Sequence, residues 1–142
     1  MKQEGEKPPF EEALHSVPLF SGLKKKQLGI AVKLGHDISF DAGQTIVSEG
    51  ELGIGFYVIL SGLAEVRHNG KILSRMGPGG FFGEMAVLDN QRRSADVVAM
   101  QPTRCAAFTA WSFEALVKLS PEIPATIMGE LAKRASANAA SK

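Results

Sequence analysis

The 142-residue chain is long enough to bury one hydrophobic core but not two, so one domain over residues 1–142 is expected. Its 44% hydrophobic and 22% charged residues are ordinary for a globular protein, and a net charge of +1 argues against binding to nucleic acid or to a membrane surface. The single cysteine, Cys105, cannot form an internal disulfide, and we find neither a signal peptide nor a run of about 18 apolar residues, so a cytoplasmic location is expected.

The N-terminal part, residues 10–35, is predicted to be helical. Residues 10–16 and 22–34 carry apolar side chains at helical spacing. Pro18 is expected to separate these two pieces, because proline cannot donate a hydrogen bond inside a helix. The lysines at 24–26 are interpreted as a solvated helix face rather than a nucleic-acid-binding patch.

The middle of the chain, residues 36–110, is predicted to form strands. Short stretches with strand chemistry, HDISF, QTIVS, FYVIL, LAEVRH and KILSRM, alternate with glycine-containing turns. Asn69-Gly70 marks the clearest hairpin turn. The expected fold class is α+β, mainly β: an antiparallel β-roll with a jelly-roll-like outline, flanked by N-terminal helices and by C-terminal helices that act as a lid.

Residues 111–137 are predicted to form the C-terminal helices. Ser120-Pro121 is a typical helix start, with serine as the cap and proline at the first helical position. Ile123, Ile127 and Leu131 then share one face. We expect this helix to fade within the final SANAASK.

The stretch FFGEMAVLDNQRRSADVVA, residues 81–99, places a glycine and an acid before a helix-like turn and two arginines before a strand. The start of a helix leaves backbone N–H groups unpaired and favours an anion, and Gly83 lets the backbone approach that anion closely. Arg93 is expected to return to the same point and hold a phosphate with two hydrogen bonds. Glu84 suits a neighbouring hydroxyl. The three residues together predict a ligand that carries one phosphate and a sugar hydroxyl.

This stretch resembles the phosphate-binding cassette of the cyclic-nucleotide-binding domain family, found in catabolite activator-type regulators, kinase regulatory subunits and cyclic-nucleotide-gated channels. The matching residues are Phe82-Gly83-Glu84-Met85-Ala86 and Arg93-Ser94-Ala95, without a gap in the spacing. The resemblance extends from about residue 14 to 134 through VPLFSGL, the DAG and EG turns, GFYVILSGLAEV and SPEI. Ile54-Gly55 departs from the polar pair often seen before that hairpin strand.

The resemblance implies a role for each matching position. The amides of Gly83 to Ala86 and the guanidinium of Arg93 are expected to hold the cyclic phosphate, and Glu84 the ribose 2′-hydroxyl. Ser94 is expected to add a phosphate contact and to be able to reach guanine. The remaining positions expected around the ligand are Phe82, Ala95, the base-lining Val66, Ser74 and Ala86, and Arg134 (less surely Lys133) in the final helix as a lid.

Simpler interpretations stand beside these. Arg92 competes with Arg93 and is interpreted as a solvated charge, Phe81 and Phe82 as core residues, and Arg134 equally well as a solvated helix charge. The dispersed histidines disfavour a metal site, and no nucleophile has a base beside it, so neither a metal nor catalysis is expected.

Two functions remain open from the sequence. The first is a sensor that binds cAMP, which is favoured, or cGMP, with movement of the C-terminal helix on binding. The second is a degenerate β-roll that only contacts other proteins. Too few residues follow Ser120 for a helix-turn-helix, so an effector protein, or a parent channel or kinase, is the expected partner.

Overall fold

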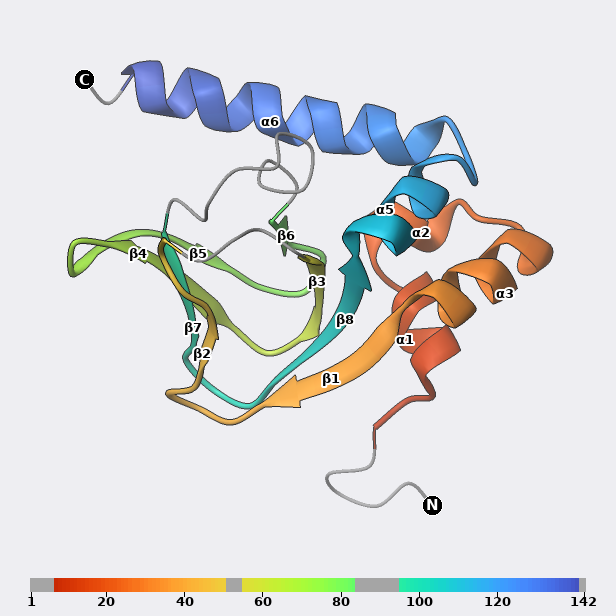
Figure 1. Ribbon diagram of the computed structural model, residues 1–142, viewed down its shortest axis with the longest axis horizontal. Coiled ribbons are helices and arrows are strands. Elements are labelled where there is room, and N and C mark those ends of the chain that lie inside the picture. Colours follow the sequence, from red (N-terminus) through yellow and green to blue (C-terminus); the bar gives the residue numbers. More distant parts are fainter. Residues whose placement is uncertain (1–6, 51–54, 84–94, 141–142) are drawn as a thin grey trace.

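The computed structural model describes residues 7–50, 55–83 and 95–140, and of residues 135–140 it describes the backbone (Figure 1). Its helices are α1 (Phe10–His15), α2 (Pro18–Ser21), α3 (Lys25–Leu34), α5 (Ala110–Val117) and α6 (Glu122–Ala140). Its strands are β1 (His36–Phe40), β2 (Thr45–Val47), β3 (Gly55–Ser61), β4 (Ala64–His68), β5 (Lys71–Met76), β6 (Phe81–Phe82), β7 (Asp96–Ala99) and β8 (Thr103–Thr109).

The described strands form two antiparallel sheets of four strands each. Their orders are β1-β8-β3-β6 and β2-β7-β4-β5. A hydrophobic cluster between the sheets joins Ile59, Phe82 and Cys105 of the first sheet to Ile46 and Val97 of the second. This arrangement confirms the predicted β-roll.

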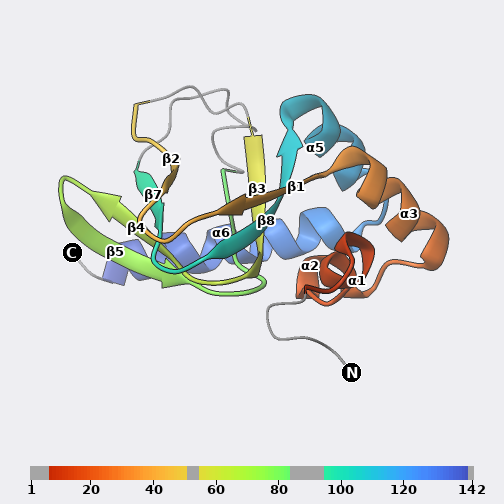
Figure 2. The same cartoon turned by 90° about the horizontal axis from the view of Figure 1, so that it is seen from below.

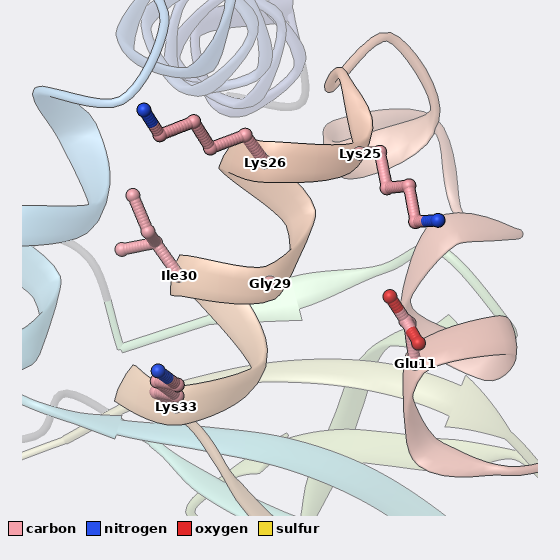
Figure 3. Close-up of a pocket in the computed structure, with 6 residues that line it drawn as sticks. All are labelled: Glu11, Lys25, Lys26, Gly29, Ile30 and Lys33. Atoms are coloured by element: carbon pink, nitrogen blue, oxygen red, sulfur yellow. The ribbon is translucent and has the colours of Figure 1, made fainter.

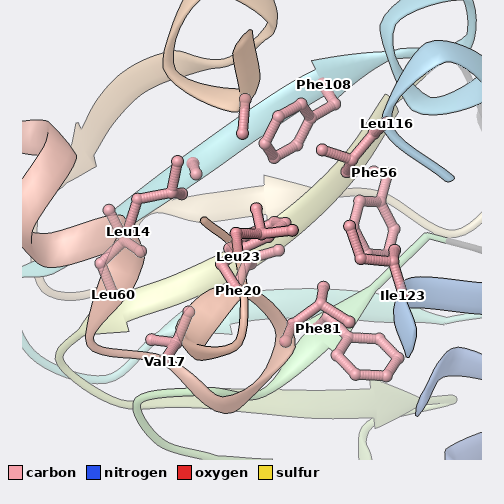
Figure 4. Close-up of a cluster of buried hydrophobic side chains, with 14 of the residues drawn as sticks. Leu14, Val17, Phe20, Leu23, Phe56, Leu60, Phe81, Phe108, Leu116 and Ile123 are labelled. Atoms are coloured by element: carbon pink, nitrogen blue, oxygen red, sulfur yellow. The ribbon is translucent and has the colours of Figure 1, made fainter. Parts of the chain in front are cut away.

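The central strands β3 and β8 of the first sheet are covered on both faces, whereas β1 is mostly exposed. Phe56, Val58 and Phe108 point away from the roll interior and pack with Phe20 and Leu116 of the helices (Figure 4). Consecutive residues of a strand point to opposite faces, so a strand that is buried on both faces has a nearly continuous apolar sequence. This requirement explains the runs FYVIL in β3 and CAAF in β8.

The N-terminal helical segment contains three helices rather than the two that were predicted. Pro18 is the first residue of α2, where its missing N–H is not needed and its fixed φ suits a helix. Pro18 therefore separates the two predicted helical pieces, as expected, and in addition begins a short helix of its own. α3 begins at Lys25 rather than at residue 22. At its N-terminus the Gln27 side chain accepts a 2.8 Å hydrogen bond from the backbone amide of Lys24, as in a capping box.

α6 passes from the helical end of the molecule, where α5 lies, along the roll toward the β4–β5 hairpin (Figure 2). The Ser120 hydroxyl accepts a 3.3 Å hydrogen bond from the Glu122 amide, as a capping hydroxyl does. α6 begins at Glu122, one residue after Pro121, which was predicted to be the first helical residue. α6 continues to Ala140, three residues beyond the predicted boundary at 137. Alanine has the highest helix propensity, so the alanine-rich sequence extends the helix where we expected it to fade.

The hairpin between β4 and β5 has the turn that the sequence predicts. Asn69 and Gly70 both have positive φ, 52° and 76°, as a two-residue hairpin turn requires. The pairing then shifts by one residue between Val66 and Arg67. This irregularity changes which side chains of β5 lie opposite those of β4.

Candidate ligand-binding site

The predicted cassette begins where β6 ends. Gly83 has φ of 94°, a left-handed conformation that glycine adopts without the steric penalty of a Cβ atom. Ala95, at the other end of the cassette, is half-buried and lies just before β7. The predicted ligand contacts that lie outside the described residues, and so stay predictions, are Glu84, Met85, Ala86, Arg93 and Ser94.

Strand β6 is fixed by two phenylalanines that point to opposite faces. Phe81 lies 5.7 Å from Phe56, between ring centroids, in the core shared with the helices. Phe82 stacks on Tyr57, with 5.2 Å between the ring centroids and an angle of 10° between the ring planes. Each phenylalanine is only 5% exposed, which confirms the interpretation of both as core residues. Their packing fixes the position from which Gly83 leaves the sheet.

Val66 and Ser74, the two strand residues expected to line the base, are brought together. They lie directly opposite each other in β4 and β5, so their side chains share one face of the sheet. Val66 is half-buried and packs against the cluster inside the roll. Ser74 is exposed. The arrangement offers an apolar contact beside a solvent-accessible hydroxyl.

Arg134 ties α6 to β6. Its guanidinium donates a 2.6 Å hydrogen bond to the backbone carbonyl of Phe81, and its central carbon lies 5.4 Å from the centroid of the Phe81 ring. A charged donor and a cation over an aromatic face are both favourable. Arg134 is therefore not simply a solvated helix charge. Its predicted contact with a ligand stays a prediction.

Glu65 is a buried carboxylate that the sequence interpretation missed. Its side chain is 2% exposed, and its two oxygens accept hydrogen bonds of 2.9 Å from Arg67 and 3.1 Å from Arg75. The hydrogen bond from Arg67, and then that from Arg75, holds the pKa of the Glu65 carboxyl below its usual value, although burial acts in the opposite direction. The alternation of side chains along a strand places Glu65 and Val66 on opposite faces of the sheet, but it does not predict that the Glu65 side chain is buried.

Arg104 of β8 is a second buried charge that the sequence did not reveal. It is 6% exposed and binds both carboxylate oxygens of Asp37, at 2.9 and 2.8 Å. It also donates a 2.7 Å hydrogen bond to the carbonyl of Pro8, before α1. A guanidinium with several fixed donors suits this geometry. The contact anchors the segment before α1 to the first sheet.

Within residues 7–50, 55–83 and 95–140, no three His, Cys, Asp or Glu side chains gather where they could hold a metal ion. None of the described helices combines the length and apolar character needed to cross a membrane.

Sequence comparison relates the chain to regulatory proteins. The model of the cyclic nucleotide-binding domain family matches residues 37–120. The cyclic AMP receptor protein of Thermus thermophilus is 32% identical over 122 residues, which cover 82% of this chain and 56% of the relative. The cAMP-dependent protein kinase regulatory subunit of Aspergillus niger is 34% identical over 113 residues, which cover 76% of this chain and 27% of the relative. The chain thus spans less than two thirds of either relative.

Solved structures share the fold. A structure of PKAR CBD2 with bound Sp-2Cl-cAMPS has a TM-score of 0.78 at 23% identity and covers 93% of this chain and 89% of that one. The Thermus thermophilus catabolite activator protein has a TM-score of 0.76 at 30% identity, covering 87% and 61%. The regulatory subunit of a cAMP-independent protein kinase A from Trypanosoma brucei has a TM-score of 0.70 at 27% identity, covering 82% and 44%.

Together, the roll and these matches define a domain with the β-roll fold that occurs in these regulatory proteins. The chain belongs to the cyclic nucleotide-binding domain family. The family resemblance predicted from residues 82–95 is thereby confirmed.

Proposed function

We propose that this chain is a sensor that binds a cyclic nucleotide, cAMP in preference to cGMP. The cyclic phosphate contacts the amides of residues 83–86 and the guanidinium of Arg93, and the ribose 2′-hydroxyl contacts Glu84. Val66 and Ser74 border the base. Family membership supports this proposal, as do the relatives whose names include cyclic AMP or cAMP-dependent kinase regulation.

One structural observation carries the proposal. Gly83, with its left-handed φ of 94°, directs the chain out of β6 at the start of the sequence Gly-Glu-Met-Ala. A glycine in that conformation can precede a run of amides open to an anion, because no Cβ obstructs the approach.

Ligand-induced stabilisation tests binding. Thermal unfolding is measured with cAMP, cGMP and 5′-AMP, each over a concentration series. A ligand at 100 times its dissociation constant stabilises the folded state by about 2.7 kcal/mol. We expect the largest shift with cAMP, a smaller one with cGMP and almost none with 5′-AMP, whose open phosphate has a different shape and charge. Equal shifts with all three would contradict selective binding of a cyclic nucleotide.

Replacement of Arg93 tests the site. In the proposed complex Arg93 pairs with the cyclic phosphate, so in Arg93→Ala cAMP binding measured by calorimetry is expected to weaken by about 2–5 kcal/mol, or about 30-fold to several thousandfold. Arg92→Ala is the matched control, because it removes the same charge from the adjacent position. Equal affinity for wild type and Arg93→Ala would show that the site is assigned wrongly.

Transmission is proposed to pass through α6. Ile123 and Ile127 bury this helix in the core shared with the other helices, and Arg134 ties it to the strand before the cassette. A ligand can shift α6 only by binding one of its positions better than another. We expect hydrogen exchange of residues 121–134 to slow when cAMP is added. Unchanged exchange at saturating cAMP would exclude this role for α6.

A β-roll without nucleotide binding is the second candidate. This candidate is supported by the structural likeness to the regulatory subunit of a cAMP-independent protein kinase, because that protein shares the fold although its kinase does not depend on cAMP. Absence of any thermal shift with the three nucleotides would select it. In either case we propose a non-catalytic regulatory domain that acts on an effector protein.

A further inference from the structure

A shallow hollow on α3 lies apart from the predicted cassette. It has a volume of about 660 Å³ and is lined by Lys25, Lys26, Gly29, Ile30 and Lys33 of α3 and Glu11 of α1. Gly29 forms its floor: a Cβ built there would meet nothing within 4 Å. Figure 3 shows Lys25 and Glu11 on one side of Gly29 and Lys26 and Ile30 on the other.

The lining is strongly basic. It holds three lysines and one glutamate, and Lys24 is exposed next to it. Among the residues that the structure describes, Lys25, Lys26 and Lys33 form no ion pair. α3 has no acidic residue in its first turn, and lysines near a helix start oppose the helix dipole. Within the part of the chain that the structure describes, no acidic residue forms an ion pair with these lysines, and an acidic partner would supply that pairing.

The hollow also has an apolar wall. Ile30 is 41% exposed, which is high for a large hydrophobic residue in a helix with a buried face. Lys26, Gly29, Ile30 and Lys33 recur at the spacing of one helix face. A glycine with an apolar neighbour and cations at both ends permits close approach of another helix.

We propose that the α3 hollow docks an acidic amphipathic helix of a partner protein. An apolar side chain of that helix packs on Ile30 over Gly29, and its carboxylates pair with Lys26 and Lys33. These lysines are about 10 Å apart along α3, at ~1.5 Å per residue, so the matching carboxylates lie about two helical turns apart. This partner surface is additional to the proposed nucleotide site and does not depend on it.

A helix fits the hollow better than two other anionic partners do. The lining holds three lysines, too few cations for the many phosphate contacts that nucleic acid requires. A concave surface is also poorly matched to a flat anionic membrane. These partners are alternative outcomes of the test.

The test uses a fluorescein-labelled synthetic helix of about 20 residues, long enough to be helical in water. It has a leucine face and glutamates seven residues apart, and a second peptide of the same composition has its glutamates gathered at one end. Fluorescence anisotropy is measured with the full chain at low and moderate salt. We expect the spaced peptide to bind more tightly than the gathered one.

Three variants assign the binding to the hollow. The double change Lys26→Glu and Lys33→Glu is expected to weaken binding of the spaced peptide about tenfold or more. Gly29→Leu fills the floor without changing charge and is expected to weaken it about fivefold. Gly29→Leu also replaces a helix glycine with a better helix former, so its loss of binding cannot be attributed to unfolding. Lys118→Glu, at the residue that follows α5 and outside the hollow, is the control and should leave the affinity within about twofold.

Four results would overturn the proposal. One is equal affinity for both peptides, and another is an equal effect of Lys118→Glu, because each indicates unspecific charge attraction. The third is preferential binding of phosphatidylserine vesicles or of duplex DNA that Lys26→Glu and Lys33→Glu abolish. The fourth is a dimer in sedimentation equilibrium that the same double change dissociates, which would assign the hollow to a second copy of the chain.

Discussion

The guanidinium of Arg134 lies on both the backbone and the side chain of Phe81: it donates to the carbonyl oxygen at 2.6 Å and lies 5.4 Å from the ring centroid. These two residues are far apart in the sequence, yet they connect the last helix to the strand that ends at Gly83. This contact joins α6 directly to β6, the strand that precedes the predicted cassette.

Arg134→Ala is expected to loosen α6 without unfolding the roll. A hydrogen bond from a charged donor and a cation–π contact together contribute about 1–2 kcal/mol at a half-exposed position. Amide exchange of residues 127–134 should accelerate about 5- to 30-fold, since 1.4 kcal/mol corresponds to a factor of ten. Hydrogen exchange followed by mass spectrometry measures this change.

Lys133→Ala is the matched control for Arg134→Ala. Lys133 is exposed on the same turn, so its replacement removes one charge but not the contact with Phe81. Equal acceleration in both variants would show that the helix responds to charge rather than to this contact.

The ion pair of Asp37 and Arg104 predicts acid sensitivity. The hydrogen bond and the charge of Arg104 lower the pKa of the Asp37 carboxyl in the folded state, against the opposing effect of burial. A lowered pKa stabilises the fold above the ordinary carboxyl value of about 3.9, and this contribution is lost as the pH falls through the folded-state pKa. Asp37→Asn should therefore be less stable than wild type at pH 7 and should lose less further stability on acidification.

Urea unfolding at several pH values between 7 and 3 measures the effect of Asp37→Asn. Glu114→Gln is the control, because Glu114 and its partner Lys118 are both largely exposed and such pairs contribute little. The same acid dependence in Asp37→Asn as in wild type would contradict the role of this pair.

Cys105 is expected to be chemically inert in the folded chain. The residue is fully buried inside the roll, and burial raises the pKa of its thiol to about 12. Only the thiolate reacts, and an unfolded thiol has a pKa of about 8.5, so at pH 8 the native chain should react with a disulfide reagent at least about a hundredfold more slowly than the unfolded chain. Rates in buffer and in concentrated guanidinium give the comparison, with Cys105→Ala as the blank. Similar rates in both would mean that the roll opens readily.

Two glycines are expected to respond oppositely to alanine. Gly62 has φ of 102°, and a Cβ there would lie 2.6 Å from the carbonyl oxygen of Pro102. Gly62→Ala should therefore destabilise by about 3 kcal/mol or more, through both strain and collision. Gly29 is helical and open, so Gly29→Ala should stabilise by about 0.5–1 kcal/mol. Urea unfolding of the two variants against wild type measures both effects, and a shift of the same sign in both would contradict this account.

Local chemistry made much of the fold predictable. Asn69-Gly70 can form a tight hairpin turn on its own account, because both positions tolerate positive φ. The apolar run of β3 and the helical spacing of Ile123 and Ile127 likewise depend on neighbouring residues in the chain. The cassette motif was recognisable for the same reason: its residues follow one another at fixed spacing.

Contacts between distant segments were decided by the tertiary structure. Counting back from Asn69-Gly70 places Ser74 opposite Glu65, but the shift in pairing places Ser74 opposite Val66 and Arg75 opposite Glu65. That shift brings together the two residues expected at the base and lets Arg75 join Arg67 on the buried carboxylate of Glu65. It depends on how the β4–β5 hairpin packs against the rest of the sheet, and residue spacing carries no record of it.

The sequence by itself determined the family and the order of most helices and strands, because both depend on short-range patterns. The structure alone decided that Arg134 meets Phe81 and that Arg104 holds Asp37 and Pro8. These are contacts of long polar side chains across large sequence separations. Their geometry exists only once the sheets and helices have packed.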